Sequence, residues 1–404
     1  MGIALRTKNN RYDYLIMLII STIAFGNVGG AFQIIRILAI LFLPFLLSNF
    51  QFIRANYKLL MFFSFWVLFA SLSFLWTTNS SEGVKHFMYL ICHILLFLEL
   101  LFLSKKASNP LKSIMLGWLF FVLITLPIAF NEIINDAHLS YSMSEGSEMH
   151  NTGREVYQKI FASVTFYNYN DYSMHLCLAL PFVMGLLFTN IDKKLFFTVV
   201  IVLCSMMYII LVNSSRGAML CLLLATILFY FYYRKSKVRY KNMVLALLIL
   251  LAIVGVVVIG DALFEQLSYR FMTKSGVFDD GHRTLLIKYS FVILCNTLFL
   301  GVGTGGVTAA LSKYYEIHWP HNIILEIWLE YGVFIMLPIL LFLIKVLGRW
   351  LKKEGNVVNK YILGTLLITL PLYGTINSHY VTCPGVWVMF VSLLIFSEKY
   401  GKSS

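Results

Sequence analysis

Four short polar motifs interrupt an otherwise strongly apolar sequence, and each carries groups that can bind an anion or move a proton. They are Asn168-Tyr-Asn-Asp-Tyr172, Asn213-Ser-Ser-Arg-Gly217, Gly281-His-Arg283 and Pro320-His-Asn-Ile-Ile-Leu-Glu326. Arg216 and Arg283 are permanent cations whose planar guanidinium matches the oxygens of a phosphate. His321 can exchange a proton near neutral pH. These residue types together predict a site for an anionic ligand with a phosphate head.

Each of these residues also has a structural interpretation. Arg216 could anchor a helix at the membrane interface, and Arg283 could be a solvated loop charge. His321 could serve only as a hydrogen-bonding group, while Asn170 and Asp171 are typical of a helix cap. Charged and histidine residues near membrane depth are costly, however, and this cost makes them functional candidates.

The composition places most of the chain in lipid. Of the 404 residues, 59% are hydrophobic and only 13% are charged, which leaves a soluble domain no way to cover its apolar surface. The formal charge of +13 does not indicate nucleic acid, because the lysines and arginines fall mostly in short gaps between apolar runs. The six cysteines are scattered singly and read as small hydrophobic residues.

The apolar runs predict an all-α polytopic membrane protein of about twelve transmembrane helices, since a span needs roughly 20 apolar residues. We treat residues 1–404 as a single membrane domain. Two segments are too long and polar for simple turns, 131–170 and 261–320. The predicted spans are 13–29, 32–48, 59–76, 86–104, 111–130, 171–189, 195–212, 216–233, 242–260, 322–345, 360–376 and 384–397.

The distribution of basic residues predicts the orientation. Most of the 32 lysines and arginines lie in alternate short loops if the N-terminus is cytoplasmic. Both termini are then inside, and both long loops are outside. The spans that begin near 171, 216 and 322 all start at the outer face, where a helix N-terminus attracts phosphate. We expect Ser214 or Ser215 to cap one of these helices and Pro320 to begin another.

The second long loop should contain a helix of its own and a tight turn. Leucine, tyrosine and isoleucine recur at helical spacing over 285–294, which predicts an interfacial helix. The glycine run 301–306 follows no predicted strand, so we interpret it as a close-packed turn rather than a phosphate loop. The adjacent acids Asp279 and Asp280 are a weak indication of a metal site. Glu316, His282 and His318 receive no role.

The order and membrane side of these motifs resemble the O-antigen polymerase and ligase family. The resemblance rests on Ser-Ser-Arg-Gly-Ala at 214–218, on Gly-His-Arg at 281–283, and on the segment from Gly301 to Gly332 with its Pro-His-Asn motif. The Asn-Asp segment at 168–172 is similar to one in the polymerase members. The family-like core spans about 165–335, and the topology extends the resemblance to the whole chain.

The resemblance implies glycosyl transfer at the periplasmic face of the bacterial inner membrane, without nucleotide sugars, metal or other cofactor. The donor would be a glycan on undecaprenyl diphosphate. Arg216 and Arg283 would bind the diphosphate and stabilise it as the leaving group. His321 would act as base or orienting group for the acceptor hydroxyl, supported by Asn322 and Glu326.

Further substrate contacts are assigned to Asn170, Asp171 and Ser215, which accompany the catalytic set. A membrane lipid and a chain-length regulator protein are candidate partners. The Asn-Asp segment and the many aromatic residues favour a polymerase over a ligase that transfers the glycan to lipid A core. A lipid-linked glycan transporter is a third alternative. Transporters usually show two repeated halves and a midplane site, and the sequence shows neither.

Overall fold

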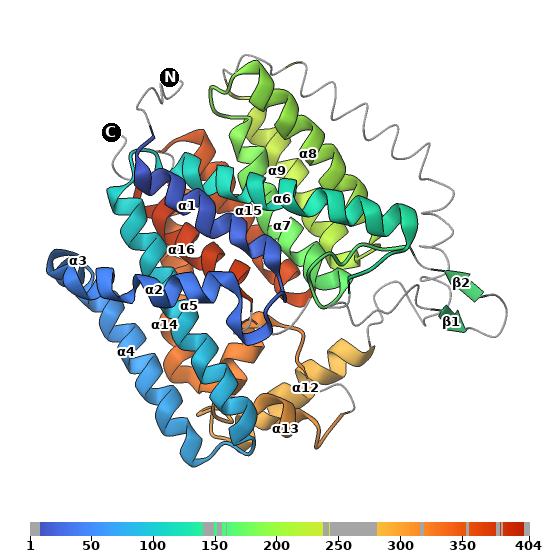
Figure 1. The fold of residues 1–404 in the computed structure, drawn as a ribbon. Coiled ribbons are helices and arrows are strands. Elements are labelled where there is room, and N and C mark those ends of the chain that lie inside the picture. The colour runs from blue at the N-terminus through green and yellow to red at the C-terminus, as the bar shows by residue number, and fades with distance from the viewer. Residues whose placement is uncertain are drawn as a thin grey trace.

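The computed structural model describes most of the chain as a bundle of helices (Figure 1). The described residues are 9–139, 149–151, 156–158, 160–236, 242, 281–315, 319–352, 355–376, 380 and 383–399. Helices are expected for apolar runs in lipid, because only an internal hydrogen-bond ladder satisfies every backbone N–H and C=O group there. Within the described residues, 7 helices are long and apolar enough to cross a membrane.

The first half of the chain contains α1 (Arg11–Ser21), η1 (Thr22–Phe25), η2 (Gly30–Phe32), α2 (Ile34–Ser48), α3 (Phe50–Ala55), α4 (Tyr57–Leu72), η3 (Ser73–Leu75), α5 (Ser80–Lys106), α6 (Pro110–Asn135), α7 (Tyr169–Leu186) and α8 (Lys193–Val212). The second half contains α9 (Arg216–Tyr233), α12 (Gly281–Asn296), α13 (Val307–Leu311), α14 (Ile323–Leu351), α15 (Val357–Ile376) and α16 (Pro384–Lys399). Strands β1 (Met149–Asn151) and β2 (Val156–Gln158) form a short antiparallel hairpin.

The predicted all-α polytopic fold is confirmed. Each predicted span on described residues coincides with a helix, whereas the span 242–260 lies outside the described residues. The first span is shorter than expected: α1 ends at Ser21 and η1 at Phe25, because the chain turns at Gly26 with a φ of 44°. The predicted helix in the second long loop is present as α12.

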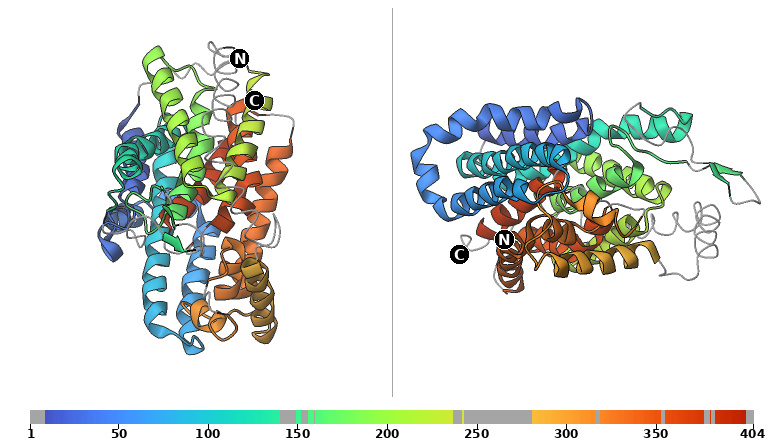
Figure 2. Two further views of the ribbon diagram at one scale, coloured as in Figure 1. Left: turned by 90° about the vertical axis from the view of Figure 1, so that its right-hand side faces the viewer. Right: turned by 90° about the horizontal axis from the view of Figure 1, so that it is seen from below.

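The core lies where α15 packs against α7, α9 and α14, while α1 packs on α6 and α2 on α5. Figure 2 shows these helices from two further sides. In both figures α12 and α13 lie beside the lower ends of α4 and α5. This arrangement places residues 281–315 of the second long loop at one end of the bundle, next to the turn between α4 and α5.

Hydrogen bonds sort the helix ends into two groups, as an alternating topology requires. One group joins ends that the charge pattern predicts to be cytoplasmic, through Asp13 with Asn109 N (2.8 Å), Lys105 with Asn56 (2.6 Å) and Arg349 with Ser397 (2.9 Å). The other joins ends predicted to be external, through Thr165 with Ala24 O (2.6 Å), Glu132 with Ser163 N (2.7 Å) and Ser73 with Thr304 (2.8 Å). We refer to this second group as the motif end of the bundle, because the polar motifs lie there.

Helix α14 is broken at Gly332, where φ is 68° and ψ is −166°. The glycine-rich segment 299–305 enters this break. Val302 N donates to Leu329 O at 2.7 Å, and Val333 N donates to Phe299 O at 2.9 Å, so backbone groups freed by the break find partners in the loop. Gly305 N donates to the buried carboxylate of Glu330 at 2.7 Å. The glycine run is therefore a close-packed turn, as predicted.

Candidate functional site

Helix α7 begins with the Asn-Asp motif. The side chain of Asn168 accepts hydrogen bonds from Asn170 N (2.8 Å) and Asp171 N (2.9 Å), so Asn168 is the N-cap. The expectation that Asn170 and Asp171 form the cap is wrong, because both already lie in the first turn. Asp171 Oδ1 is buried and has no hydrogen-bond partner among the described residues. This leaves an acceptor available at the start of α7.

The turn between α8 and α9 is tied to the start of α7 by Asn213. Its side chain accepts from Ala162 N at 2.8 Å and donates to Ser173 Oγ at 3.0 Å. The next residue, Ser214, has a φ of 50°, and its hydroxyl donates to backbone carbonyls of α8.

Helix α9 therefore starts without the serine cap that we expected. Ser215 occupies the N-cap position, but its side chain makes no capping hydrogen bond, and the hydroxyl of Ser214 turns back to α8. Arg216 is the first residue of α9 and is half-buried. The N–H groups of this helix start are thus not occupied by a serine hydroxyl, and a cation stands beside them.

Helix α14 begins at the histidine motif. Asn322 is the N-cap, and its side chain accepts from Ile324 N (3.0 Å) and Leu325 N (3.1 Å). Pro320 does not begin the helix as predicted, because the asparagine two residues later provides the cap. His321, immediately before the cap, is half-buried and has a φ of 45°, a conformation that few L-residues adopt. The backbone of His321 therefore has a left-handed conformation immediately before the start of α14.

Residues between α15 and α16 join the starts of α14 and α7. The buried carboxylate of Glu326 accepts a hydrogen bond from Tyr380 N at 3.2 Å. Cys383 Sγ lies 3.5 Å from His175 Nε2, and His175 Nδ1 lies 2.8 Å from Asp171 O. Support of His321 by Asn322 and Glu326 stays a prediction.

The starts of α7, α9 and α14 converge at the end of α15. A methyl group at Gly217 would lie 2.9 Å from Ile376, and one at Gly374 would lie 3.6 Å from Ile323. Gly217 follows Arg216, and Ile323 follows Asn322, so two of the motifs flank the same turn of α15. The third motif, at the start of α7, is connected to the α8–α9 turn by the hydrogen bond from Asn213 to Ser173. Three helix N-termini at one place produce a positive backbone potential there.

Arg283 lies on α12, which packs against the first part of α14. Leu286 and Leu294 of α12 share a buried cluster with Leu329 of α14. Arg283 itself is half-buried and stands in the first turn of α12. The structure thus brings all four motifs to the motif end of the bundle.

An apolar groove reaches the same region from the side of the bundle. It has a volume of about 490 Å³ and is lined by residues of α4, α5, α14 and α16, among them Trp66, Phe97, Ile339 and Trp387. Its end includes Tyr380, the residue whose N–H group binds Glu326. The groove therefore lies along the predicted spans, with Tyr380 at the side of the motif end and Lys58, in the first turn of α4, at the opposite side.

Arg36 is a buried cation that sequence reasoning missed. Its guanidinium lies 3.8 Å above the ring of Tyr89 and donates to Gly30 O at 3.1 Å. It also interacts electrostatically with Cys383, which directly precedes α16. The signal was available, because Arg36 interrupts the apolar run 34–48, and charges in such runs are functional candidates.

Several expectations concern residues outside the described part of the chain. Asp279 and Asp280, Glu316 and His318 all belong to this group. Among the described residues, no group of three or more histidine, cysteine or acidic side chains is arranged to hold a metal ion.

The described architecture is that of a multi-pass helical membrane protein with a cationic, polar site at one end. Residues 198–340 match the family model described as O-antigen ligase. The match covers about a third of the chain and supports the resemblance to the O-antigen polymerase and ligase family. It covers Arg216, Arg283 and His321, whereas Asn170 and Asp171 lie before it. No curated protein matches the chain.

Proposed function

We propose that this protein is an O-antigen polymerase. It joins oligosaccharide repeat units carried on undecaprenyl diphosphate at the periplasmic face of the inner membrane. The observation that carries this proposal is the convergence of three helix starts at the end of α15, where Arg216 and His321 both lie in the segment that matches the family model.

The chemistry at this site is a displacement at the anomeric carbon of the donor sugar. The acceptor hydroxyl oxygen forms a new bond to that carbon, and the bond from the carbon to the diphosphate oxygen breaks. The diphosphate leaves with the electron pair, and His321 receives or orients the hydroxyl proton. A diphosphate is already a good leaving group, so the site needs cations more than a second acid.

The cations and helix starts suit this leaving group. Arg216 and Arg283 each offer a fork of N–H donors to phosphate oxygens, and the N-termini of α9 and α14 add the positive ends of their helix dipoles. Arg36 contributes further positive charge from the start of α2. Asp171 Oδ1, buried without a described partner, would accept a hydrogen bond from a sugar hydroxyl. Asn170 and Ser215 would contribute further polar contacts to the glycan.

The apolar groove supports a lipid-linked donor. Apart from Lys58, its lining is almost entirely hydrocarbon and aromatic, and it includes Tyr380, whose N–H group binds Glu326 at the polar site. A polyprenyl chain in the groove would place its diphosphate at the helix starts, at the boundary between lipid and water. A nucleotide sugar has no use for such a groove.

O-antigen ligase is the second candidate function, and the description of the matching family favours it. A ligase uses the same donor and the same leaving group but transfers the finished glycan to lipid A core. The cations, His321 and the groove would therefore have the same roles, and only the acceptor would differ.

The lipopolysaccharide banding pattern on a gel distinguishes these functions. The gene would be deleted and then restored as wild type or as Arg283→Ala. A core that carries a single repeat unit after deletion supports the polymerase, because ligation still operates. A bare core with long chains on the lipid carrier supports the ligase instead. An unchanged ladder would contradict both functions, and restoration of the ladder by Arg283→Ala would contradict the proposed role of Arg283.

A further inference from the structure

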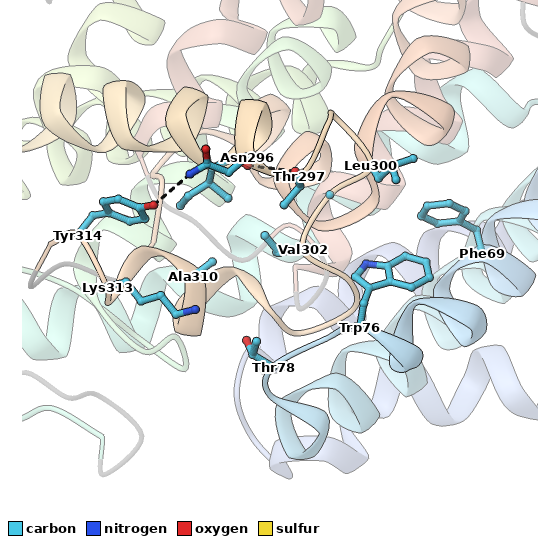
Figure 3. A pocket seen from close by; sticks show the side chains of 12 residues that line it. Phe69, Trp76, Thr78, Asn296, Thr297, Leu300, Val302, Ala310, Lys313 and Tyr314 are labelled. Carbon is cyan, nitrogen blue, oxygen red and sulfur yellow. Dashed lines mark hydrogen bonds between the residues drawn. The ribbon is translucent and has the colours of Figure 1, made fainter.

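A second cavity lies apart from the convergent helix starts, between the end of α4 and the pair α12–α13. Its volume is about 520 Å³. Figure 3 shows Phe69 and Trp76 on one side of this cavity and Asn296, Lys313 and Tyr314 on the other. The cavity lies at the motif end of the bundle, because α4 ends and α5 begins beside it.

Two aromatic side chains of this cavity are partly exposed. Trp76 is 42% exposed and packs edge-on against Phe69 with ring centroids 5.8 Å apart. Tyr314 is 38% exposed and stacks on Tyr289 at 5.5 Å. Packing on one side fixes these rings and leaves other parts of them open. Fixed, partly exposed rings are suited to stack on the C–H face of a sugar, and they lose little side-chain entropy on binding.

Polar groups accompany these rings. Asn296 Nδ2 donates to the hydroxyl of Tyr314 at 3.3 Å, which orients both groups at the cavity wall. Thr78 and Lys313 also line the cavity. An amide, a hydroxyl, a phenol and an ammonium group around two aromatic rings provide both donors and acceptors for sugar hydroxyls. A lipid acyl chain would use none of them.

Helix α12 connects this cavity to the proposed diphosphate site. Arg283 stands in its first turn and Asn296 is its last residue. At a rise of about 1.5 Å per residue, the two side chains are separated by roughly 20 Å along the helix axis. A glycan whose diphosphate lies at Arg283 would have to extend over several sugar rings to reach Asn296.

We propose that this cavity is a carbohydrate-binding subsite that holds a glycan segment several sugars away from the diphosphate. This proposal rests on the proposed function, because only the proposed transferase reaction brings a glycan to this end of the protein. In this proposal Trp76, Tyr314 and Asn296 contact the sugars and thereby hold the repeat units along α12. The competing interpretation is that Trp76 and Tyr314 are interfacial anchors that hold the protein in the bilayer.

A binding experiment tests the proposal without catalysis. The probe is the repeat-unit oligosaccharide, released by mild acid from the lipid-linked intermediate of the host. Saturation-transfer NMR measures its binding to the full-length protein in nanodiscs. We expect Trp76→Ala and Asn296→Ala each to weaken binding by about tenfold. Tyr57→Ala is the matched control, because Tyr57 is 54% exposed at the opposite end of α4 and does not line the cavity.

The outcomes separate this proposal from the proposed function. Arg283→Ala should lose transfer but retain oligosaccharide binding, since it stands at the far end of α12. Binding to the wild type without any transferase activity would uphold the subsite and contradict the proposed function. If the wild type does not bind the oligosaccharide, or if Trp76→Ala binds it as the wild type does, the subsite is wrong. An equal loss in Tyr57→Ala would favour interfacial anchoring and also overturn it.

Discussion

Arg216 is the first residue of α9, so its guanidinium and the positive end of the helix dipole can act on the same anion. Arg283 has a comparable place in the first turn of α12. Both positions keep a permanent cation beside a positive backbone end. Such an arrangement attracts anions, and this attraction is the physical reason to propose a charged ligand for the site.

Replacement of either arginine tests this assignment. We expect Arg216→Ala and Arg283→Ala each to lower the rate of glycan extension by roughly 100-fold, because one charged donor to the leaving group is lost. The measurement is transfer by purified protein from a lipid-linked donor, with membrane insertion checked by immunoblot. Arg54→Ala is the control, since Arg54 is exposed in the last turn of α3. Normal rates in both test variants would contradict the diphosphate site.

His321 can be probed separately for proton transfer and for hydrogen bonding. We expect His321→Ala to abolish transfer, since no group would remain to receive or orient the proton of the acceptor hydroxyl. His321→Gln retains a hydrogen-bonding side chain without an imidazole. An inactive glutamine variant is the expected result for a base, and an active one would show that His321 only orients the acceptor. Rates of the two variants at saturating donor supply the answer.

Among the elements, α14 carries both the histidine motif and the break that receives the glycine-rich turn. The break lets Glu330 bind both Gly305 N (2.7 Å) and His86 Nδ1 (3.0 Å), so it joins the start of α14 to α5. Trp319, just before the histidine motif, stacks on His86 with ring centroids 6.0 Å apart. The position of His321 thus depends on the geometry of the whole helix start.

A methyl group at Gly332 should disrupt this arrangement. The residue has φ 68° and ψ −166°, a region open almost only to glycine, and a Cβ there would lie 2.4 Å from Leu300 O. We expect Gly332→Ala to lose more than about 2 kcal/mol of stability. Gly348→Ala in the same helix is the control, because a Cβ at Gly348 meets nothing within 4 Å. Thermal unfolding in detergent measures both, and equal melting temperatures would contradict the role of the break.

For the whole molecule, the charge pattern and the hydrogen bonds between helix ends agree on an alternating topology. The contacts establish which ends lie together, and the assignment of the motif end to the outside stays a prediction from the basic loops. The aromatic cavity lies at the motif end, and the lining of the apolar groove includes Tyr380 beside the proposed site. The orientation of the protein in the membrane therefore decides in which compartment the reaction takes place.

Reporter fusions determine that orientation. Alkaline phosphatase joined after Thr78, at the motif end, should be active because it is exported. The same reporter joined after Ser236, in a strongly basic predicted inner loop, should be inactive. A fluorescent protein fused at the two positions should give the opposite pattern and serves as the control. A reversed result would place the site in the cytoplasm and would exclude a periplasmic reaction.

Most of the fold follows from apolar length, which is a local property of the sequence. The helix boundaries were less predictable, because they depend on which side chain reaches a free N–H group. Asn168 and Asn322 cap α7 and α14, whereas Ser214 turns back to α8. Asparagine, serine and proline are all suitable near helix starts, so sequence alone does not decide between neighbours.

The sequence by itself determined the membrane environment, the alternating topology and the identity of the polar motifs, because each depends on composition and spacing along the chain. Tertiary structure alone decided that three motifs meet at α15, that the glycine run enters α14 at Gly332, and that Arg36 is buried beside them. It also formed the cavity between Trp76 and Tyr314. These features join residues that are far apart in the chain, and only the packing of side chains sets such distances.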